Sequence, residues 1–334
     1  MSTFVAEYDI KKRINRLGWA LTIMCGVMLL MTVVNEMVYA SLVIVGKEKL
    51  TISLGAFFES FFYMSMFLIP ASLYYAMGGQ NSSEPIRFRL KLPKYLPLIL
   101  LSGIGVIMSA SMVNDWFCDF IGFSLPMVDT AQYMSDPEIF ALYMTLSLAP
   151  AFAEELLFRG VVYSNLRPYG KTYAILVSSL MFALMHQNAA QLFYTMVAGV
   201  ILALVYEATD SIWTSILLHM CNNLYAVLQT AILYRFDEAS ASAIIYLAHG
   251  LLIFLGAIST ICLLIIKKNA DQKKKGTDEI CSEGAFGIHR AEIKNIGGHH
   301  LPLGQGFKIL LACPGMMTYI VISLLSVVMS AIIL

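Results

Sequence analysis

The chain has 334 residues, of which 58% are hydrophobic and 13% are charged, and its formal net charge is zero. A soluble domain has about 45–50% apolar and about 25% charged residues, so this composition excludes an ordinary soluble domain and indicates a polytopic membrane protein. The sequence has no basic patch of the kind that binds nucleic acid, and we expect no nucleic-acid partner.

Eight or nine apolar stretches are long enough to cross a bilayer, for which a helix needs about 20 residues. In chain order they lie near residues 17–45, 54–77, 95–114, 137–165, 172–188, 190–208, 211–234, 243–266 and 309–334. We therefore expect an all-α fold, a polytopic transmembrane helix bundle of about eight core spans plus an extra C-terminal span.

This pattern divides the chain into five regions that differ in polarity and in the number of spans. They are residues 1–136 with about three spans, 137–234 with the polar motifs described below, 235–267 with the eighth span, 268–305, and 306–334 with the last span. The region 268–305 is polar and is interpreted as a cytoplasmic linker. His299 and His300 lie there without a partner cluster nearby, and we interpret them as solvated rather than as metal ligands.

The distribution of Lys and Arg indicates the orientation, because cytoplasmic connections are enriched in these residues. Basic residues precede the first span, fill the second connection, follow the fourth span and follow the eighth, whereas the third connection is acidic. The basic residues are Lys11, Lys12, Arg13, Arg16, Arg87, Arg89, Lys91, Lys94, Arg167, Lys171, Lys267, Lys268 and Lys273–Lys275, and the acidic ones are Asp115, Asp119, Asp129 and Asp136. We expect a cytoplasmic N-terminus and an integral protein of a bacterial plasma membrane.

The stretch AEELLFRG at residues 153–160 places three ionisable side chains at membrane depth, where charges are costly and usually functional. Glu155 and Arg159 are four residues apart, so they share a helix face and neutralise each other. Glu154 points about 100° away and has no local partner. We therefore expect different roles for the two carboxylates, and a purely structural network of all three residues is the alternative.

Two further motifs place polar side chains inside apolar spans. FALMH puts Phe182 and His186 four residues apart on the fifth span, and HMCNN puts His219 and Asn223 four residues apart on the seventh. A lone histidine in a bundle is usually an interhelical hydrogen-bonding residue. Two histidines, an asparagine and the unpaired Glu154 together indicate a functional site.

The depth of these residues favours their grouping, with one exception. At a rise of 1.5 Å per residue, Glu154 and His186 both lie roughly 20 Å from the turn at 167–171. His219 lies only about eight residues past the Asp210 turn, so we expect it to be shallower unless that turn is sunk into the bundle.

Five other polar residues have no place in this grouping. Asn35 and Glu36 in the first span and Glu59 in the second either pair with one another or face a wet cavity. Glu207 and Asp210 lie at a cytoplasmic turn, where we expect them to be exposed.

The residue types point to hydrolysis. A carboxylate and an imidazole together deprotonate a water molecule for attack on a carbonyl group, while a second histidine and an asparagine donate hydrogen bonds to the oxyanion that forms. Alternatively, Glu154, His186 and His219 bind a zinc ion that activates the water. The signatures HExxH, GxSG and GxGD of other intramembrane hydrolases are absent from the sequence.

The order EExxxR, FxxxH and HxxxN, with each motif on its own span, resembles the CPBP family of CAAX proteases and bacteriocin-processing enzymes, also called the Abi family. The resemblance covers about residues 137–230. It implies an intramembrane peptidase with a cavity open to the cytoplasm. It assigns water activation to Glu154 and His186, the oxyanion to His219 and Asn223 or a metal to His219, and supporting roles to Glu155, Arg159 and Phe182.

We therefore expect an intramembrane endopeptidase that cleaves membrane-associated proteins or peptides by water that glutamate and histidine activate, with or without a divalent metal such as zinc. The bilayer and the substrate are the expected partners. The alternatives are a non-catalytic membrane scaffold or bacteriocin-immunity protein that keeps the fold and binds a peptide, and a transporter that uses Glu154 and His186 as a proton relay.

Overall fold

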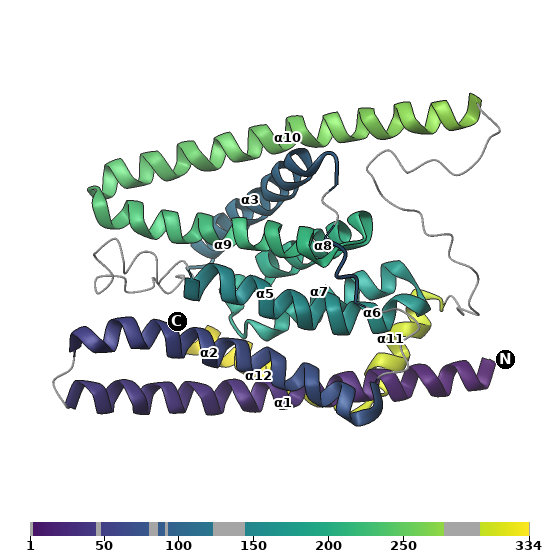
Figure 1. Ribbon diagram of the computed structural model, residues 1–334, viewed down its shortest axis with the longest axis horizontal. Helices are drawn as coiled ribbons and strands as arrows, with labels where there is room; N and C mark the ends of the chain where they lie inside the picture. The colour runs from purple at the N-terminus through teal and green to yellow at the C-terminus, as the bar shows by residue number, and fades with distance from the viewer. Residues whose placement is uncertain are drawn as a thin grey trace.

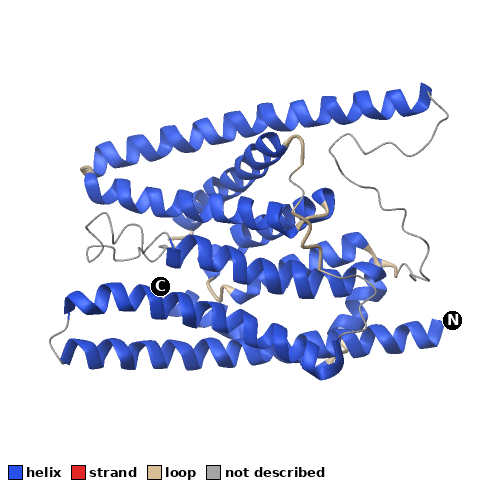
Figure 2. Cartoon of the chain, viewed as in Figure 1, coloured by secondary structure: helices blue, strands red, loops and turns tan. Residues whose placement is uncertain are grey.

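Helices, turns and short irregular segments make up the part of the chain that the structure describes, and no strand is present there (Figure 2). The computed structural model describes residues 3–44, 48–79, 86–90, 93–122, 144–276 and 301–333. This confirms the all-α class. His299, His300, Asp129 and Asp136 lie outside these ranges.

Most of the helices are long. They are α1 (Thr3–Ile44), α2 (Glu48–Tyr74), α3 (Leu96–Phe120), α5 (Ala149–Glu155), α6 (Ser164–Leu166), α7 (Lys171–Met185), α8 (Leu192–Thr209), α9 (Ile212–Arg235), α10 (Glu238–Gly276), α11 (Leu303–Leu311) and α12 (Pro314–Ile333). The π-helical stretches η1 (Tyr75–Gly79), η2 (Met144–Leu148) and η3 (Leu156–Tyr163) and the 3₁₀ turns η4 (Arg167–Tyr169) and η5 (Ala189–Gln191) complete them. Seven of the described helices are long and apolar enough to cross a membrane, as an integral membrane protein requires.

The segment that carries the EExxxR motif lies in the middle of the bundle (Figure 1). On one side of it α1 packs against α2 and α12, and on the other side α3 packs against α8 and α10. The motif segment itself contacts α2, α7 and α9. Its side chains from Leu157 to Tyr163 are buried, whereas α10 exposes large apolar side chains such as Leu247 and Phe254. An outer face of that kind suits contact with lipid.

Two boundaries differ from those expected. The helix α10 continues to Gly276, so the first residues of the expected linker 268–305 are helical, since Lys, Gln and Asp are compatible with a helix. The last span begins at Pro314, and Leu303–Leu311 form the separate helix α11. Proline is tolerated in the first turn of a helix but not in its interior, which explains the break.

Basic side chains of several connections lie at the same end of the bundle. Arg16 of α1 donates a hydrogen bond to the Gly78 carbonyl after α2 (2.7 Å), and Arg87 pairs with Glu207 at the end of α8. The opposite end is marked by Asn114 of α3, which donates to the Ala190 carbonyl before α8 (2.8 Å). This clustering fits the charge pattern of the sequence, while the side of the membrane that each end faces stays a prediction.

Glycines allow α3 and α10 to cross at backbone contact. A Cβ atom on Gly256 would lie 2.5 Å from the Cα atom of Gly105 and 2.8 Å from the Leu101 carbonyl oxygen. Beside this contact, Ser102 and Thr260 share a hydrogen bond of 2.7 Å. Small residues at a close crossing are a common way to join membrane helices.

We expect Gly256→Val to lower the free energy of unfolding in detergent micelles by about 1–3 kcal/mol, because the added side chain forces the two backbones apart. Gly250→Val is the matched control, because Gly250 lies on the same helix with open space around it. Thermal unfolding followed by circular dichroism measures both. Equal losses in the two variants would contradict a tight crossing.

Candidate active site

A buried ion pair stands at the centre of the motif residues. Arg159 Nη1 donates to Glu155 Oε1 (2.7 Å), and both side chains are 0% exposed. Arg159 Nη2 donates to the Gly199 carbonyl of α8 (2.9 Å). The predicted contact between Glu155 and Arg159 is present even though Arg159 lies in the π-helical stretch η3. Such stretches occur frequently at functional sites.

The same carboxylate orients His219. The Nδ1 atom of His219 lies 3.0 Å from Glu155 Oε1, and the Ser215 hydroxyl donates to Glu155 Oε2. A carboxylate is an acceptor, so Nδ1 carries the proton and Nε2 is the nitrogen that faces the rest of the site. Glu155 thus joins Arg159 to α9 and fixes which edge of the His219 ring is presented.

Phe182 is the aromatic contact between these groups. Its ring lies edge to face against His186 (4.9 Å between centroids) and His219 (5.8 Å), and the Arg159 guanidinium carbon lies 4.7 Å from its centroid. A cation near an aromatic face is favourable when both are desolvated. The FxxxH motif therefore supplies two parts of the site. One is His186, and the other is the Phe182 ring, which lies between His186 and His219.

Glu154 differs from Glu155 in its surroundings, as the helical spacing predicts. It is 3% exposed, its Oε1 atom accepts a hydrogen bond from the Tyr63 hydroxyl of α2, and its Oε2 atom has no hydrogen-bond partner among the described residues. Oε2 lies 3.9 Å from His219 Nε2. An unpaired buried carboxylate oxygen costs free energy. A separation of this length between two polar atoms is one that a water molecule can bridge.

His186 lies at the end of a helix rather than within a span. The helix α7 has 15 residues and ends at Met185, and Gln187 has the left-handed φ of 51°. His186 Nδ1 donates to the Phe182 carbonyl (2.9 Å), so Nε2 is again the nitrogen with a free lone pair. The expected fifth span near 172–188 thus stops short at Met185 and is followed by η5, whose Ala190 lies at the Asn114 end of the bundle.

A small pocket joins the remaining motif residues. Phe182, His186, His219 and Asn223 all line it, together with residues of α3 and α8. Asn223 Oδ1 accepts a hydrogen bond from Asn222 (3.3 Å), and among the described residues no acceptor is seen for the Asn223 amide group. The structure therefore brings the predicted residues of all three motifs to one place.

The predicted shallow position of His219 is wrong. The turn between α8 and α9 is largely buried, because the irregular segment 86–90 contacts it. The Ile212 amide donates to the Arg87 carbonyl (3.0 Å), the Ser211 hydroxyl donates to the Arg89 carbonyl (2.7 Å), and Ser211 is buried. Helix α9 thus begins beneath this segment, which brings His219 level with Glu154.

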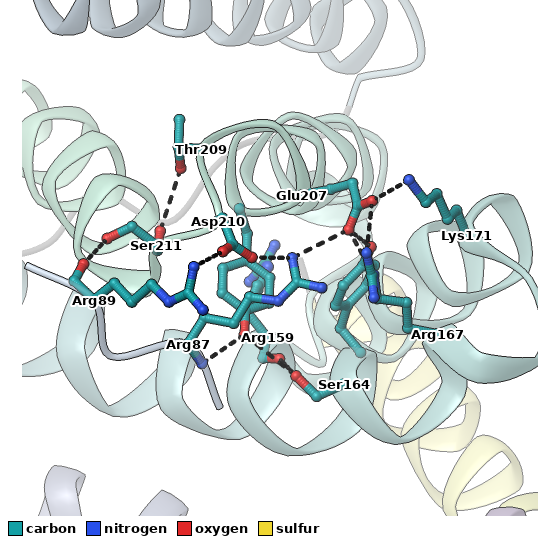
Figure 3. Close-up of polar contacts among 12 residues, drawn as sticks. Arg87, Arg89, Arg159, Ser164, Arg167, Lys171, Glu207, Thr209, Asp210 and Ser211 are labelled. Carbon is teal, nitrogen blue, oxygen red and sulfur yellow. Dashed lines mark hydrogen bonds and ion pairs between the residues drawn. The ribbon is translucent and has the colours of Figure 1, made fainter. Parts of the chain in front are cut away.

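Glu207 and Asp210 are also less exposed than expected, with side chains 14% and 16% exposed. Both face cations from other segments (Figure 3). The ion pairs are Glu207 with Arg87 (3.4 Å), Arg167 (2.8 Å) and Lys171 (2.6 Å), and Asp210 with Arg87 (2.9 Å) and Arg89 (2.9 Å). This network fastens segment 86–90 to the ends of α6, α7 and α8.

Asn35 and Glu36 of the first span are not among the residues that contact the site. Glu36 is exposed on α1, and Asn35 is partly exposed beside it. The side chain of Glu59 lies outside the described part of the structure. The exposure of Glu36 does not distinguish between the two positions expected for it, so its role stays a prediction.

The described side chains, as arranged, include no cluster that could bind a metal ion. The described residues contain no group of three or more His, Cys, Asp or Glu side chains that could hold a metal ion. Glu154 and His219 approach each other, but Nδ1 of His219 is engaged by Glu155. The metal role of Glu154, His186 and His219 therefore stays a prediction.

Sequence reasoning missed two residues that contact the site directly. Ser215 lies four residues before His219 on one face of α9, so its contact with Glu155 was accessible from helical spacing. Tyr63 lies 91 residues from Glu154 in an apolar stretch, and no local pattern signals it. Only the packing of α2 against α5 brings these two residues together.

We expect Arg159→Met to lower the free energy of unfolding by about 3–5 kcal/mol, because it leaves Glu155 charged and buried without its cation. Arg89→Met removes one partner of an ion pair in which Arg89 is 64% exposed, and about 1 kcal/mol or less is expected there. Denaturation in detergent micelles compares the two variants. Similar losses would contradict a central role for the buried pair.

Comparison with known proteins bears on the same region. Residues 136–225 match the family described as type II CAAX prenyl endopeptidase Rce1-like. No curated protein and no solved structure matches the chain. The matched residues contain the EExxxR, FxxxH and HxxxN motifs in full, and they confirm the resemblance to CAAX proteases. Residues 136–225, about a quarter of the chain, are thus similar to the Rce1-like type II CAAX prenyl endopeptidases.

Proposed function

We propose that this protein is an intramembrane endopeptidase that hydrolyses peptide bonds of membrane-associated proteins or peptides with water activated by Glu154 and His186. One observation carries the proposal. A buried glutamate keeps one carboxylate oxygen unpaired, 3.9 Å from a histidine nitrogen, beside a pocket that a second histidine and an asparagine line. Desolvated polar groups of this kind are expensive to maintain and mark functional sites.

Hydrolysis assigns a role to each of these groups. A water molecule at the pocket gives a proton to Glu154 Oε2 while His186 Nε2 accepts its second hydrogen bond, and the hydroxide attacks the carbonyl carbon of the scissile bond. The proton then passes to the leaving nitrogen, and the products are a carboxylic acid and an amine. No metal is needed for the atoms of this step to balance.

The oxyanion that forms needs hydrogen-bond donors in place before the reaction. The amide group of Asn223 is one donor. The resemblance assigns His219 to the oxyanion as well, and the Nε2 edge of its ring faces the site because Glu155 holds Nδ1. Phe182 and the ion pair keep these donors at fixed spacing.

The family match supports a membrane-bound peptide substrate, and the position of the pocket among the helices agrees with it. We propose that substrates approach from the end of the bundle that carries the basic network, and that this end faces the cytoplasm of a bacterial cell. Labelling of single cysteines placed at Arg89 and at Ile121, near the two ends of α3, tests this orientation.

We expect Glu154→Gln to reduce hydrolysis by at least about 10³-fold, because an amide cannot accept the proton of water. The measurement compares peptide termini in membranes of cells that express wild type or the variant at matched levels. Glu238→Gln is the control, because Glu238 is an exposed carboxylate at the start of α10. New termini are expected with wild type and Glu238→Gln and not with Glu154→Gln.

Identical termini with wild type and Glu154→Gln would reject the peptidase. If both forms also rescue the phenotype of a strain that lacks the gene, the protein is a non-catalytic scaffold or immunity protein. A proton-coupled transporter would instead show uncoupled uptake in Glu154→Gln.

The metal question has its own measurement. From the arrangement of the side chains we expect purified protein to retain its activity after treatment with a chelator. Loss of activity that added zinc restores would show that Glu154, His186 and His219 rearrange to bind the ion.

A further inference from the structure

Glu154 has one anchoring contact, and it comes from outside the region that matches the family. The Tyr63 hydroxyl of α2 donates a hydrogen bond to Glu154 Oε1. No other hydrogen bond reaches this carboxylate from the described residues. Glu155, one residue further on, accepts from Arg159, His219 and Ser215.

The contact with Tyr63 gives the two carboxylate oxygens of Glu154 different surroundings. Oε1 is occupied by the phenol, and Oε2 is left facing His219 Nε2 across 3.9 Å. A glutamate side chain has three rotatable bonds, so burial alone does not determine where its carboxylate points. The phenol is a donor on a rigid ring, and it determines the direction of the second oxygen.

The ring of Tyr63 is itself held in place. It lies 5.1 Å from the ring of Phe67, one turn further along α2, and Phe67 is buried in the main core. Helix α2 packs against both α5 and η3. The hydroxyl is therefore presented by a packed helix rather than by a loop.

We propose that Tyr63 is a positioning residue for hydrolysis, which holds Oε1 of Glu154 so that Oε2 is directed to the attacking water. This inference rests on the proposed function. It adds a requirement that residues 136–225 cannot meet alone, because α2 supplies part of the site.

The test compares Tyr63→Phe with Tyr74→Phe in the full-length protein. Phenylalanine keeps the ring and its packing and removes only the hydroxyl. Tyr74 is the matched control, because it is a buried tyrosine on the same helix whose hydroxyl has no hydrogen-bond partner among the described residues. With a peptide identified from the terminus comparison, we expect Tyr63→Phe to lower kcat about 10- to 100-fold with KM and Tm near wild type. Tyr74→Phe is expected to leave kcat unchanged.

An infrared measurement tests the contact without any substrate. The carboxylate band that Glu154→Gln removes is expected to change frequency in Tyr63→Phe and to stay in place in Tyr74→Phe. An unchanged band, a normal kcat in Tyr63→Phe, or a rise in KM with normal kcat would each overturn the proposal.

The two proposals fail in distinguishable ways. If Glu154→Gln retains full activity, the peptidase mechanism is wrong, whatever the band shows. If Glu154→Gln is inactive while Tyr63→Phe matches wild type, the mechanism stands and the role of Tyr63 is wrong.

Discussion

The ion pair between Glu155 and Arg159 is the contact on which the arrangement of the site depends. Two opposite charges with no exposed surface must satisfy each other, and they do so at 2.7 Å. Their remaining hydrogen bonds go to α8 through Gly199 and to α9 through Ser215 and His219. A buried pair of this kind adds little net stability compared with apolar packing. Removing one partner, however, greatly lowers the free energy of unfolding, because the other charge is left buried and unpaired. The pair therefore acts as a geometric constraint that holds three helices in one relative position.

The contrast between two adjacent glutamates follows from this constraint. Glu155 has a structural role, because each of its carboxylate oxygens has a hydrogen-bond partner. Glu154 points to the other side of the helix, where its two oxygens face a phenol and a histidine edge. The protein thus places a neutralised charge beside an unpaired one, and the first fixes the orientation of the histidine ring that faces the second.

Helical periodicity in the sequence predicted many of the contacts within the site. The spacing of Glu155 and Arg159, the apolar spans and the membership of His186, His219 and Asn223 in one cluster were all accessible from the chain. The failures came from contacts between distant segments. The buried turn before α9 depends on hydrogen bonds from segment 86–90, and Glu207 and Asp210 are covered because Arg87 and Arg167 reach them. Tyr63 belongs to the same class, since nothing in the sequence of α2 distinguishes it from its neighbours.

The early end of α7 has a consequence for what can be cleaved. Its 15 residues place His186 about 22 Å from the turn at Gly170. For a chain that enters from that end, an extended peptide covers this distance with about six or seven residues, whereas a helix needs about 15. The length of α7 thus sets the distance between this end of the bundle and His186. In the proposed peptidase, this length favours polypeptides that can unwind for several residues beyond that end of the bundle and disfavours bonds that lie next to a folded domain.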